Sequence, residues 1–185
     1  MASRHDWLEA GIGILAEDGA PALTLERLTD RLDLTKGSFY HHFKGMAGFK
    51  TDLLAYYESE HTSRFIQDAE CAGETAGTKL HRLMELVLAA KGDSDDLENA
   101  MRAWALQDDE ARALQERVDR RRIDYLRTLV RGLDTADRDP GPLARLFYLL
   151  LVGAQQLVPP VPAEELREIY TLALRLAPQE NGRTS

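Results

Sequence analysis

The stretch that decides the fold is LTLERLTDRLDLTKGSFYHHF, residues 23–43. Thr24 and Thr35 each precede a short run of residues at helical spacing, and threonine is a favourable residue just before a helix. Between the two runs, Asp33 and Leu34 leave room for only a short connection. The stretch therefore predicts two short helices that meet at a tight turn, which is the arrangement of a helix-turn-helix motif.

The apolar residues of this stretch can form a small core between the two helices. They are Leu25, Leu28, Leu32, Leu34, Phe39 and Phe43. A further amphipathic run, residues 6–17, precedes the stretch and is stopped by a Gly-Ala-Pro sequence. We therefore expect residues 1–50 to form a three-helix domain around this core.

The distribution of charge singles out residues 35–50. The whole chain has a net charge of −8, and residues 1–50 hold six Lys or Arg against seven Asp or Glu, so net basicity does not indicate nucleic-acid binding. Residues 35–50, however, contain three lysines and two histidines but no acid. This acid-free segment coincides with the second helix and its flank, where a helix-turn-helix meets DNA.

The second helix begins with Lys36, Gly37 and Ser38, which are small or long polar residues. In a helix-turn-helix, this part of the second helix reaches the edges of the bases in the major groove. Glycine lets the backbone approach DNA closely, and the hydroxyl groups of Thr24 and Thr35 suit phosphate oxygens. We expect these five residues to contact DNA.

The same helix continues with Tyr40, His41 and His42, three consecutive residues with polar tips. A purely structural three-helix unit with buried aromatic residues explains Phe39 and Phe43, but the three polar-tipped residues cannot all face inward. The pattern favours DNA binding, with these contacts expected at Thr24, Thr35, Lys36, Gly37, Ser38, Tyr40, His41, His42, Lys44 and Lys50.

At these residues the sequence resembles the TetR family of bacterial regulators. The resemblance covers about residues 6–55 and rests on the Thr-Leu-x-x-Leu run, the short turn, the Lys-Gly-Ser-Phe-Tyr-x-His-Phe string and the helix before them. It implies an all-α fold, with an N-terminal helix-turn-helix domain and a C-terminal helical domain for ligand binding and dimerisation. It also implies that Tyr40 and His42 lie against the DNA backbone and that residues 36–38 touch bases.

Two residues depart from the family pattern. The family usually has glycine in the turn, where this chain has Asp33, but aspartate tolerates the left-handed conformation better than most residues. The family often has a phosphate-binding lysine at the start of the next helix, where this chain has Met46. Either Lys44 or Lys50 substitutes for that lysine, or the contact is lost.

The rest of the chain also follows helical periodicity. Helices are expected over residues 46–69, 78–91, 97–107, 108–133, 142–157 and 163–176. We expect residues 1–50 to be the DNA-binding domain, continuing into a connecting helix to about residue 69. Residues 51–178 are then the helical effector-binding and dimerisation domain, and residues 179–185 a flexible tail.

Residues 146–152 are apolar around almost the whole helix circumference, so this helix needs partners on several sides. It is either interior to a monomer or part of a four-helix bundle that two chains form from their last two helices. The bundle predicts an interface of Leu146, Leu149, Leu150, Val152, Leu157, Leu166, Ile169 and Leu172. An effector pocket among the helices of residues 78–133 is expected to involve His81, Met84, Arg102, Trp104, Gln107, Tyr125 and Phe147, although each of these residues has an ordinary structural role as an alternative.

Several classes of function find no support in the sequence. Cys71 is the only cysteine, which excludes an intrachain disulfide and fits a reducing cytoplasm. The most apolar stretch, residues 146–154, is too short for a membrane span, which needs about 20 residues. No phosphate-binding loop or paired-cysteine motif is present, and adjacent histidines on a helix point about 100° apart, so neither an enzyme, a cofactor nor a metal site is expected.

These observations predict a cytoplasmic homodimer that binds double-stranded operator DNA and regulates transcription. Repression of a palindromic operator, with release by a small-molecule effector, is the mode that the family resemblance implies. The alternative is a helical small-molecule-binding or interaction protein with weakened DNA binding, and Asp33 and Met46 are the residues that favour it.

Overall fold

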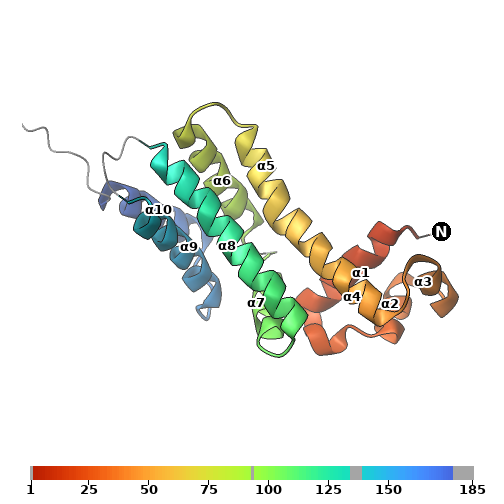
Figure 1. Cartoon of the computed structure of the whole chain (residues 1–185). Coiled ribbons are helices and arrows are strands. Elements are labelled where there is room, and N and C mark those ends of the chain that lie inside the picture. Colours follow the sequence, from red (N-terminus) through yellow and green to blue (C-terminus); the bar gives the residue numbers. More distant parts are fainter. Residues whose placement is uncertain (1, 93, 134–138, 177–185) are drawn as a thin grey trace, which may run out of the picture. The chain divides into compact units, whose positions relative to one another are not determined.

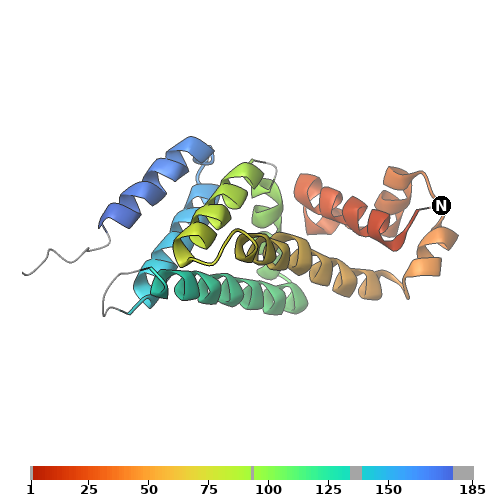
Figure 2. The same ribbon diagram turned by 90° about the horizontal axis from the view of Figure 1, so that it is seen from above.

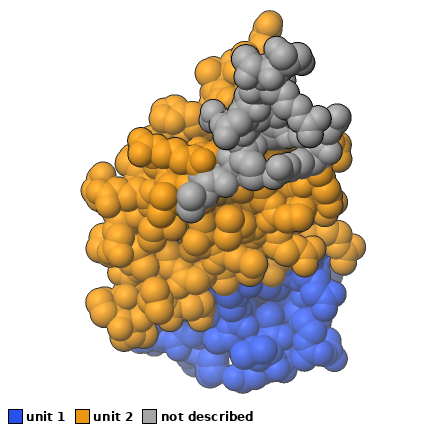
Figure 3. Space-filling model, turned by 90° about the vertical axis from the view of Figure 1, so that its left-hand side faces the viewer, with its two compact units in different colours: residues 1–62, 92–118 blue, residues 63–91, 119–185 orange. Residues whose placement is uncertain are grey.

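The computed structural model describes residues 2–92, 94–133 and 139–176, and all the regular secondary structure in these ranges is helical (Figure 1). The expected tail, residues 179–185, lies outside the described residues. The chain forms two compact units, coloured separately in Figure 3. Unit 1 comprises Met1–Thr62 and Gly92–Val118, and unit 2 comprises Ser63–Lys91 and Asp119–Ser185. Unit 1 therefore contains a segment, residues 92–118, that follows the predicted DNA-binding domain by more than forty residues.

Unit 1 contains the first four helices of the chain and two later segments. These are α1 (Arg4–Asp18), α2 (Leu25–Leu32), α3 (Lys36–His42), α4 (Met46–Glu58), α7 (Asp95–Ala105) and the first half of α8 (Asp109–Arg131). Ser3 caps α1 in a reciprocal capping box with Asp6, while Thr24 and Thr35 cap α2 and α3 as the sequence predicts. A single 3₁₀ turn, Ala20–Ala22, links α1 to α2.

The core of unit 1 is aromatic. Trp7, Phe39 and Phe49 are completely or almost completely buried, and the Phe39 ring lies 5.4 Å from that of Trp7 and 5.6 Å from that of Phe49. The core residues predicted from the sequence are confirmed: Leu25, Leu28, Phe39 and Phe43 are buried, and Leu32 and Leu34 are partly buried against them. This core holds α2 and α3 against α1 and α4.

The helix expected over residues 46–69 is not one uninterrupted α-helix. A π-helical turn, Ser59–Ser63, separates α4 from α5 (Arg64–Glu70). Such turns widen the hydrogen-bond register by one residue, and helical periodicity in the sequence does not reveal them. The boundary between the two units falls within this turn, between Thr62 and Ser63.

Unit 2 contains α5, α6 (Ala76–Ala90), the second half of α8, α9 (Gly141–Gln156) and α10 (Ala163–Leu176). Its core is built from Leu88, Val130, Ala144, Phe147, Leu166 and Tyr170. The helices α9 and α10 pack against one another, as Figure 2 shows, and the Arg167 guanidinium of α10 pairs with the Glu85 carboxylate of α6. Across the described ranges, no helix combines the length and apolarity that crossing a bilayer requires.

Candidate nucleic-acid interface

The turn between α2 and α3 places the two helices of the motif. Asp33 adopts the left-handed conformation, with φ 53° and ψ 49°, at the position where glycine is usual in the family pattern. The Leu34 N–H donates to the Thr29 carbonyl at 3.0 Å, closing the end of α2 with a bond typical of helix termini. Aspartate thus sustains the tight turn, and this departure from the family pattern leaves the motif intact.

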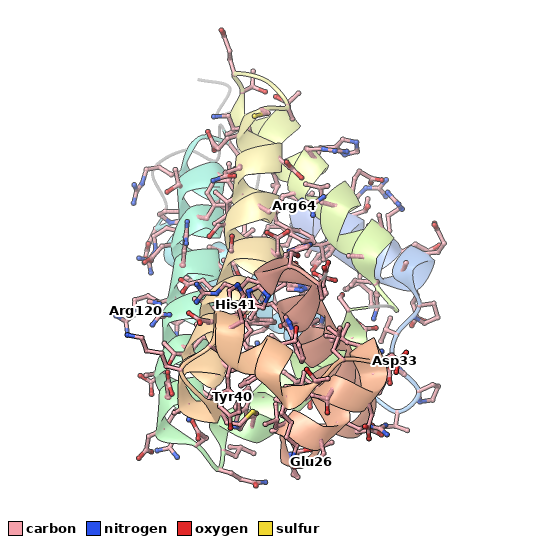
Figure 4. All side chains as sticks on the ribbon, turned by 90° about the vertical axis from the view of Figure 1, so that its right-hand side faces the viewer. Glu26, Asp33, Tyr40, His41, Arg64 and Arg120 are labelled. Carbon is pink, nitrogen blue, oxygen red and sulfur yellow. The ribbon has the colours of Figure 1, made fainter. Side chains whose placement is uncertain are left out.

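The outer face of α3 is polar and exposed. Figure 4 views unit 1 with α2 and α3 in front, and it labels Tyr40 and His41 on this helix. Tyr40 is 60% exposed, while its neighbour Phe39 is fully buried and meets the Tyr40 ring edge-on at 5.6 Å. The buried phenylalanine fixes the rotation of the helix, and so fixes which side chains point outward.

Gly37 has no internal reason to be glycine. A Cβ atom added there would meet only the Thr35 hydroxyl, at 3.7 Å, which is ordinary van der Waals contact. The residue is exposed, and its φ is not in the left-handed range. An exposed backbone with no side chain suits a surface that another molecule approaches closely.

The predicted phosphate-binding hydroxyl groups have local roles. Thr24 Oγ1 accepts from the Arg27 N–H at 3.2 Å, and Thr35 Oγ1 accepts from the Ser38 N–H at 3.4 Å. Because a hydroxyl group that accepts one hydrogen bond can still donate another, both threonines keep a donor for an anionic partner.

His42 is also engaged within the domain. Its Nε2–H donates to the Ala2 carbonyl at 3.0 Å, since a carbonyl oxygen can only accept. This bond ties the residues before α1 to the end of α3. The sequence predicts only a DNA contact for His42, and its structural role becomes visible only in the fold.

Most of the cations in residues 1–50 are paired with carboxylates. Five of the six form ion pairs inside unit 1: Arg4 with Asp52, Arg27 with Asp18, Arg31 with Glu17, Lys36 with Glu26, and Lys50 with Asp108. Lys44 is exposed and makes no ion pair with the described part of the chain. Two of the three lysines in the acid-free segment, Lys36 and Lys50, are therefore neutralised in space by acids from α2 and from the start of α8.

The Lys36–Glu26 pair lies at the start of both helices of the motif. Lys36 Nζ is 2.6 Å from Glu26 Oε1, and both side chains are more than half exposed. The hydrogen bond from Lys36 lowers the pKa of Glu26, and the same bond raises the pKa of Lys36. Both groups are charged at neutral pH.

Lys44 and Lys50 are the two candidates to replace the phosphate-binding lysine that is absent at Met46, and their surroundings differ. Lys50 Nζ lies 2.7 Å from Asp108 Oδ2 and 3.1 Å from Glu110 Oε2, so its charge is already shared with two carboxylates. Met46 and Lys50, one helical turn apart, both line a hollow of about 240 Å³ in unit 1, together with Leu23, Phe49, Leu53 and Trp104 among others. Lys44 is the better candidate because its charge is uncompensated.

The ten predicted DNA-contacting residues all lie in unit 1, but the predicted effector-pocket residues are divided. Arg102, Trp104 and Gln107 belong to unit 1, whereas His81, Met84, Tyr125 and Phe147 belong to unit 2. His81 and Gln107 are exposed, and Phe147 is packed into the core of unit 2. Trp104 lines the hollow beside Met46 in unit 1.

Tyr125 has a defined partner in unit 2. Its hydroxyl donates to Glu70 Oε1 at 2.8 Å. Burial, and then the hydrogen bond to this carboxylate, raise the pKa of Tyr125 well above its usual range. The residue therefore remains a neutral hydrogen-bond donor at every physiological pH.

The helix-turn-helix region matches a known protein family. Residues 8–52 match the family model described as "Bacterial regulatory proteins, tetR family". No curated protein sequence matches the chain. The match spans most of α1, all of α2 and α3, and the first half of α4.

Solved structures share the fold over nearly the whole chain. Reduced NemR from E. coli matches with a TM-score of 0.79 and 18% identity, covering 95% of this chain and 99% of that one. A putative transcriptional regulator from Saccharomonospora viridis in complex with choline has a TM-score of 0.78 and 17% identity, with coverage of 94% and 95%. The regulatory protein TetR from Rhodobacter sphaeroides matches with a TM-score of 0.73 and 19% identity, covering 92% of this chain and 96% of that one. Over the residues that these matches cover, the chain therefore shares the fold of these regulators.

Proposed function

We propose that this protein is a DNA-binding transcriptional regulator that reads a palindromic operator through α3. The observation that carries the proposal is the orientation of α3: Phe39 is locked in the core, and Lys36, Gly37 and Tyr40 face outward beside it. A short helix that presents small and polar residues at its start suits the major groove. The family match over residues 8–52 supports the same function.

The proposed DNA contacts fall into two groups, those to base edges and those to phosphates. Lys36, Gly37 and Ser38 contact base edges, whereas Tyr40, Lys44 and the threonine hydroxyl groups contact phosphates. His41, which is exposed, adds a donor on the same helix. His42 acts indirectly, by holding the residues before α1 through its hydrogen bond to Ala2.

The protein acts as a homodimer through α9 and α10. Four predicted interface residues are exposed leucines, Leu146, Leu149, Leu157 and Leu172, and Val158 beside them is also exposed. Leu166, which the sequence analysis includes, is fully buried in the core of its own chain and is therefore removed from the proposed interface. Exposed leucines on two packed helices suit a second copy of the same helix pair, and two-fold symmetry matches a palindromic site.

A small-molecule effector would then release a repressor from the operator by favouring an arrangement in which the two α3 helices no longer match the DNA. Support for an effector comes from the fold, since a neighbour of the same fold was solved with choline. A repressor of this kind acts where chromosomal DNA is accessible, which places the proposed site of action in the bacterial cytoplasm.

A second candidate is a helical interaction or small-molecule-binding protein with weakened DNA binding. It is favoured by the pairing of five of the six cations in residues 1–50 and by Met46 in place of a lysine. A gel shift of the intact chain with the DNA that flanks its own gene separates the two. Retardation that survives an excess of unrelated duplex supports the regulator, and its absence at low salt supports the alternative.

A further inference from the structure

We propose that Glu26 is a specificity-determining residue: by holding the Lys36 ammonium, its carboxylate suppresses binding to non-target DNA more strongly than binding to the operator. The inference rests on the proposed function, because it assigns a role to a residue of α2 in DNA reading by α3. Glu26 is not among the DNA-contacting residues that the sequence pattern and the family resemblance predict.

Lys36 and Glu26 form a close ion pair across the start of the motif. Lys36 Nζ lies 2.6 Å from Glu26 Oε1, and the two side chains are 58% and 65% exposed. Glu26 sits in the first turn of α2, and Lys36 is the first residue of α3, so the carboxylate reaches the ammonium across the start of the motif. Figure 4 labels Glu26 on the side of unit 1 that presents α2 and α3.

The fold does not need this ion pair. Thr24 and Thr35 already cap the two helices, and the aromatic core around Phe39 holds them together. Ion pairs between exposed side chains contribute little to stability, because solvent and salt screen them. A lysine in the first turn of a helix is also unfavourable for that helix. The pair is therefore better explained by what Lys36 binds.

The ion pair weakens binding to non-target DNA. Affinity for arbitrary sequence comes almost entirely from lysine and arginine residues that neutralise phosphates. With Glu26 attached, Lys36 brings no net charge to the surface, and a phosphate would have to displace the carboxylate while being repelled by it. Non-target DNA therefore loses one phosphate contact.

Binding to the operator is compatible with the ion pair. An ammonium group has three donors, so Lys36 can keep one bond to Glu26 and still donate to the O6 and N7 acceptors of a guanine. A neutral base edge is not repelled by the carboxylate as a phosphate is. The operator contact therefore survives the pair, and the ratio of operator affinity to non-target affinity rises.

The test compares the intact wild-type chain with Glu26→Gln on two duplexes: a site selected by the protein from a randomised library, and a duplex of the same length without that site. For Glu26→Gln, we expect non-target affinity to rise about 5- to 10-fold near 0.1 M salt, and the slope of log K against log[salt] to steepen by about 0.9. Operator affinity should change by less than about twofold, so that the specificity ratio falls.

The matched control is Glu17→Gln, which removes the same charge from another exposed ion pair of unit 1, the one with Arg31. It should leave the ratio unchanged. In the double variant Lys36→Ala/Glu26→Gln, the gain on non-target DNA should disappear, since it acts through Lys36. Equal thermal melting of all variants shows that folding is unaffected.

The inference is overturned if Glu26→Gln and Glu17→Gln change both duplexes alike, because the effect is then one of net charge. It is also overturned if Glu26→Gln weakens the operator as much as it strengthens the non-target duplex. If the wild-type chain selects no sequence at all, the proposed function fails and the inference fails with it, which is a different and recognisable result.

Discussion

The Lys50 ammonium of α4 lies 2.7 Å from the Asp108 carboxylate, which is itself the cap of α8. Asp108 Oδ1 accepts from the backbone N–H groups of Glu110 and Ala111, both at 3.0 Å, while Oδ2 accepts from Lys50. A second bond, from the Thr51 hydroxyl to Glu110, joins the same two elements. The start of α8 is therefore attached directly to the helix that follows α3.

This dual role predicts different results for two substitutions of Asp108. Asp108→Ala removes both the helix cap and the ion pair, so the free energy of unfolding should fall by about 1–2 kcal/mol. Asp108→Asn should cost less, because asparagine caps helices as well as aspartate does and loses only the charge. Urea unfolding followed by circular dichroism measures both. Equal losses would show that Asp108 does not act as a cap.

The same carboxylate predicts a pH dependence. The hydrogen bond from Lys50, followed by those from the backbone, lowers the pKa of Asp108 below its usual 3.8. A depressed pKa stabilises the folded state above the unfolded-state value, and that stability is lost as the pH falls through the lower, folded-state pKa. The stability difference between wild type and Asp108→Asn should thus be constant from pH 5 to 7, by the same linkage, and shrink below about pH 4. A difference that grows on acidification would contradict the assignment.

Gly11 lies where the core of unit 1 has no room for a larger side chain. A Cβ atom at this position would lie 2.7 Å from Phe49 Cζ and 3.0 Å from Leu53 Cδ1, and both side chains are buried. Gly11→Ala should therefore destabilise the protein by about 1–3 kcal/mol. Gly48→Ala is the matched control, since its Cβ would meet nothing closer than 4.0 Å and should stabilise α4 by about 0.5–1 kcal/mol. The same sign for both variants in thermal unfolding would refute the packing argument.

Substitution of Tyr40 should lower the affinity for DNA without changing which base sequence is preferred. Its hydroxyl is on a 60% exposed side chain, and the proposal assigns it to a phosphate. Tyr40→Phe should weaken binding to every duplex by the same factor, because a phosphate contact carries no base information. Lys36→Ala should instead change the order in which operator variants are bound. Fluorescence anisotropy with a set of single-base variants separates the two, and a changed order for Tyr40→Phe would reverse the role assignments.

The exposed leucines of unit 2 predict the oligomeric state. Leu149 on α9 is 60% exposed, and replacing it by glutamate should place a charge in the dimer interface and dissociate the dimer. Leu106→Glu is the control, because Leu106 is 80% exposed but lies in unit 1 outside α9 and α10. Sedimentation velocity should give a monomer for the first and a dimer for the second. A dimer for both would place the interface elsewhere.

The local features of the motif could be predicted from the sequence because they depend on neighbours along the chain. The caps at Thr24 and Thr35, the turn at Asp33 and the buried face with Leu28 and Phe39 all follow from residue type and helical spacing. The π-helical turn, Ser59–Ser63, could not be predicted in this way, since an α-helix with one wider turn keeps nearly the same periodicity.

The charge state of the interface could not be predicted because it depends on residues far apart in sequence. Lys50 meets Asp108 from 58 residues away, and Lys36 meets Glu26 across the turn of the motif. Burial of Leu166 is of the same kind, because periodicity marks the apolar face of α10 but not which of its residues face the chain's own core. Counting charges within a window of sequence overestimates the positive charge of the proposed interface, because the count omits the carboxylates that pair with Lys36 and Lys50.

The central claim, that α3 reads DNA, is tested most directly by selection from a randomised duplex library with the intact chain. The account predicts enrichment of a palindrome whose two half-sites are about one helical turn or a multiple of it apart, near 34 Å centre to centre for one turn. It also predicts that Lys36→Ala alters the enriched bases within each half-site. Failure of the folded wild-type chain to enrich any sequence at low salt would contradict the account.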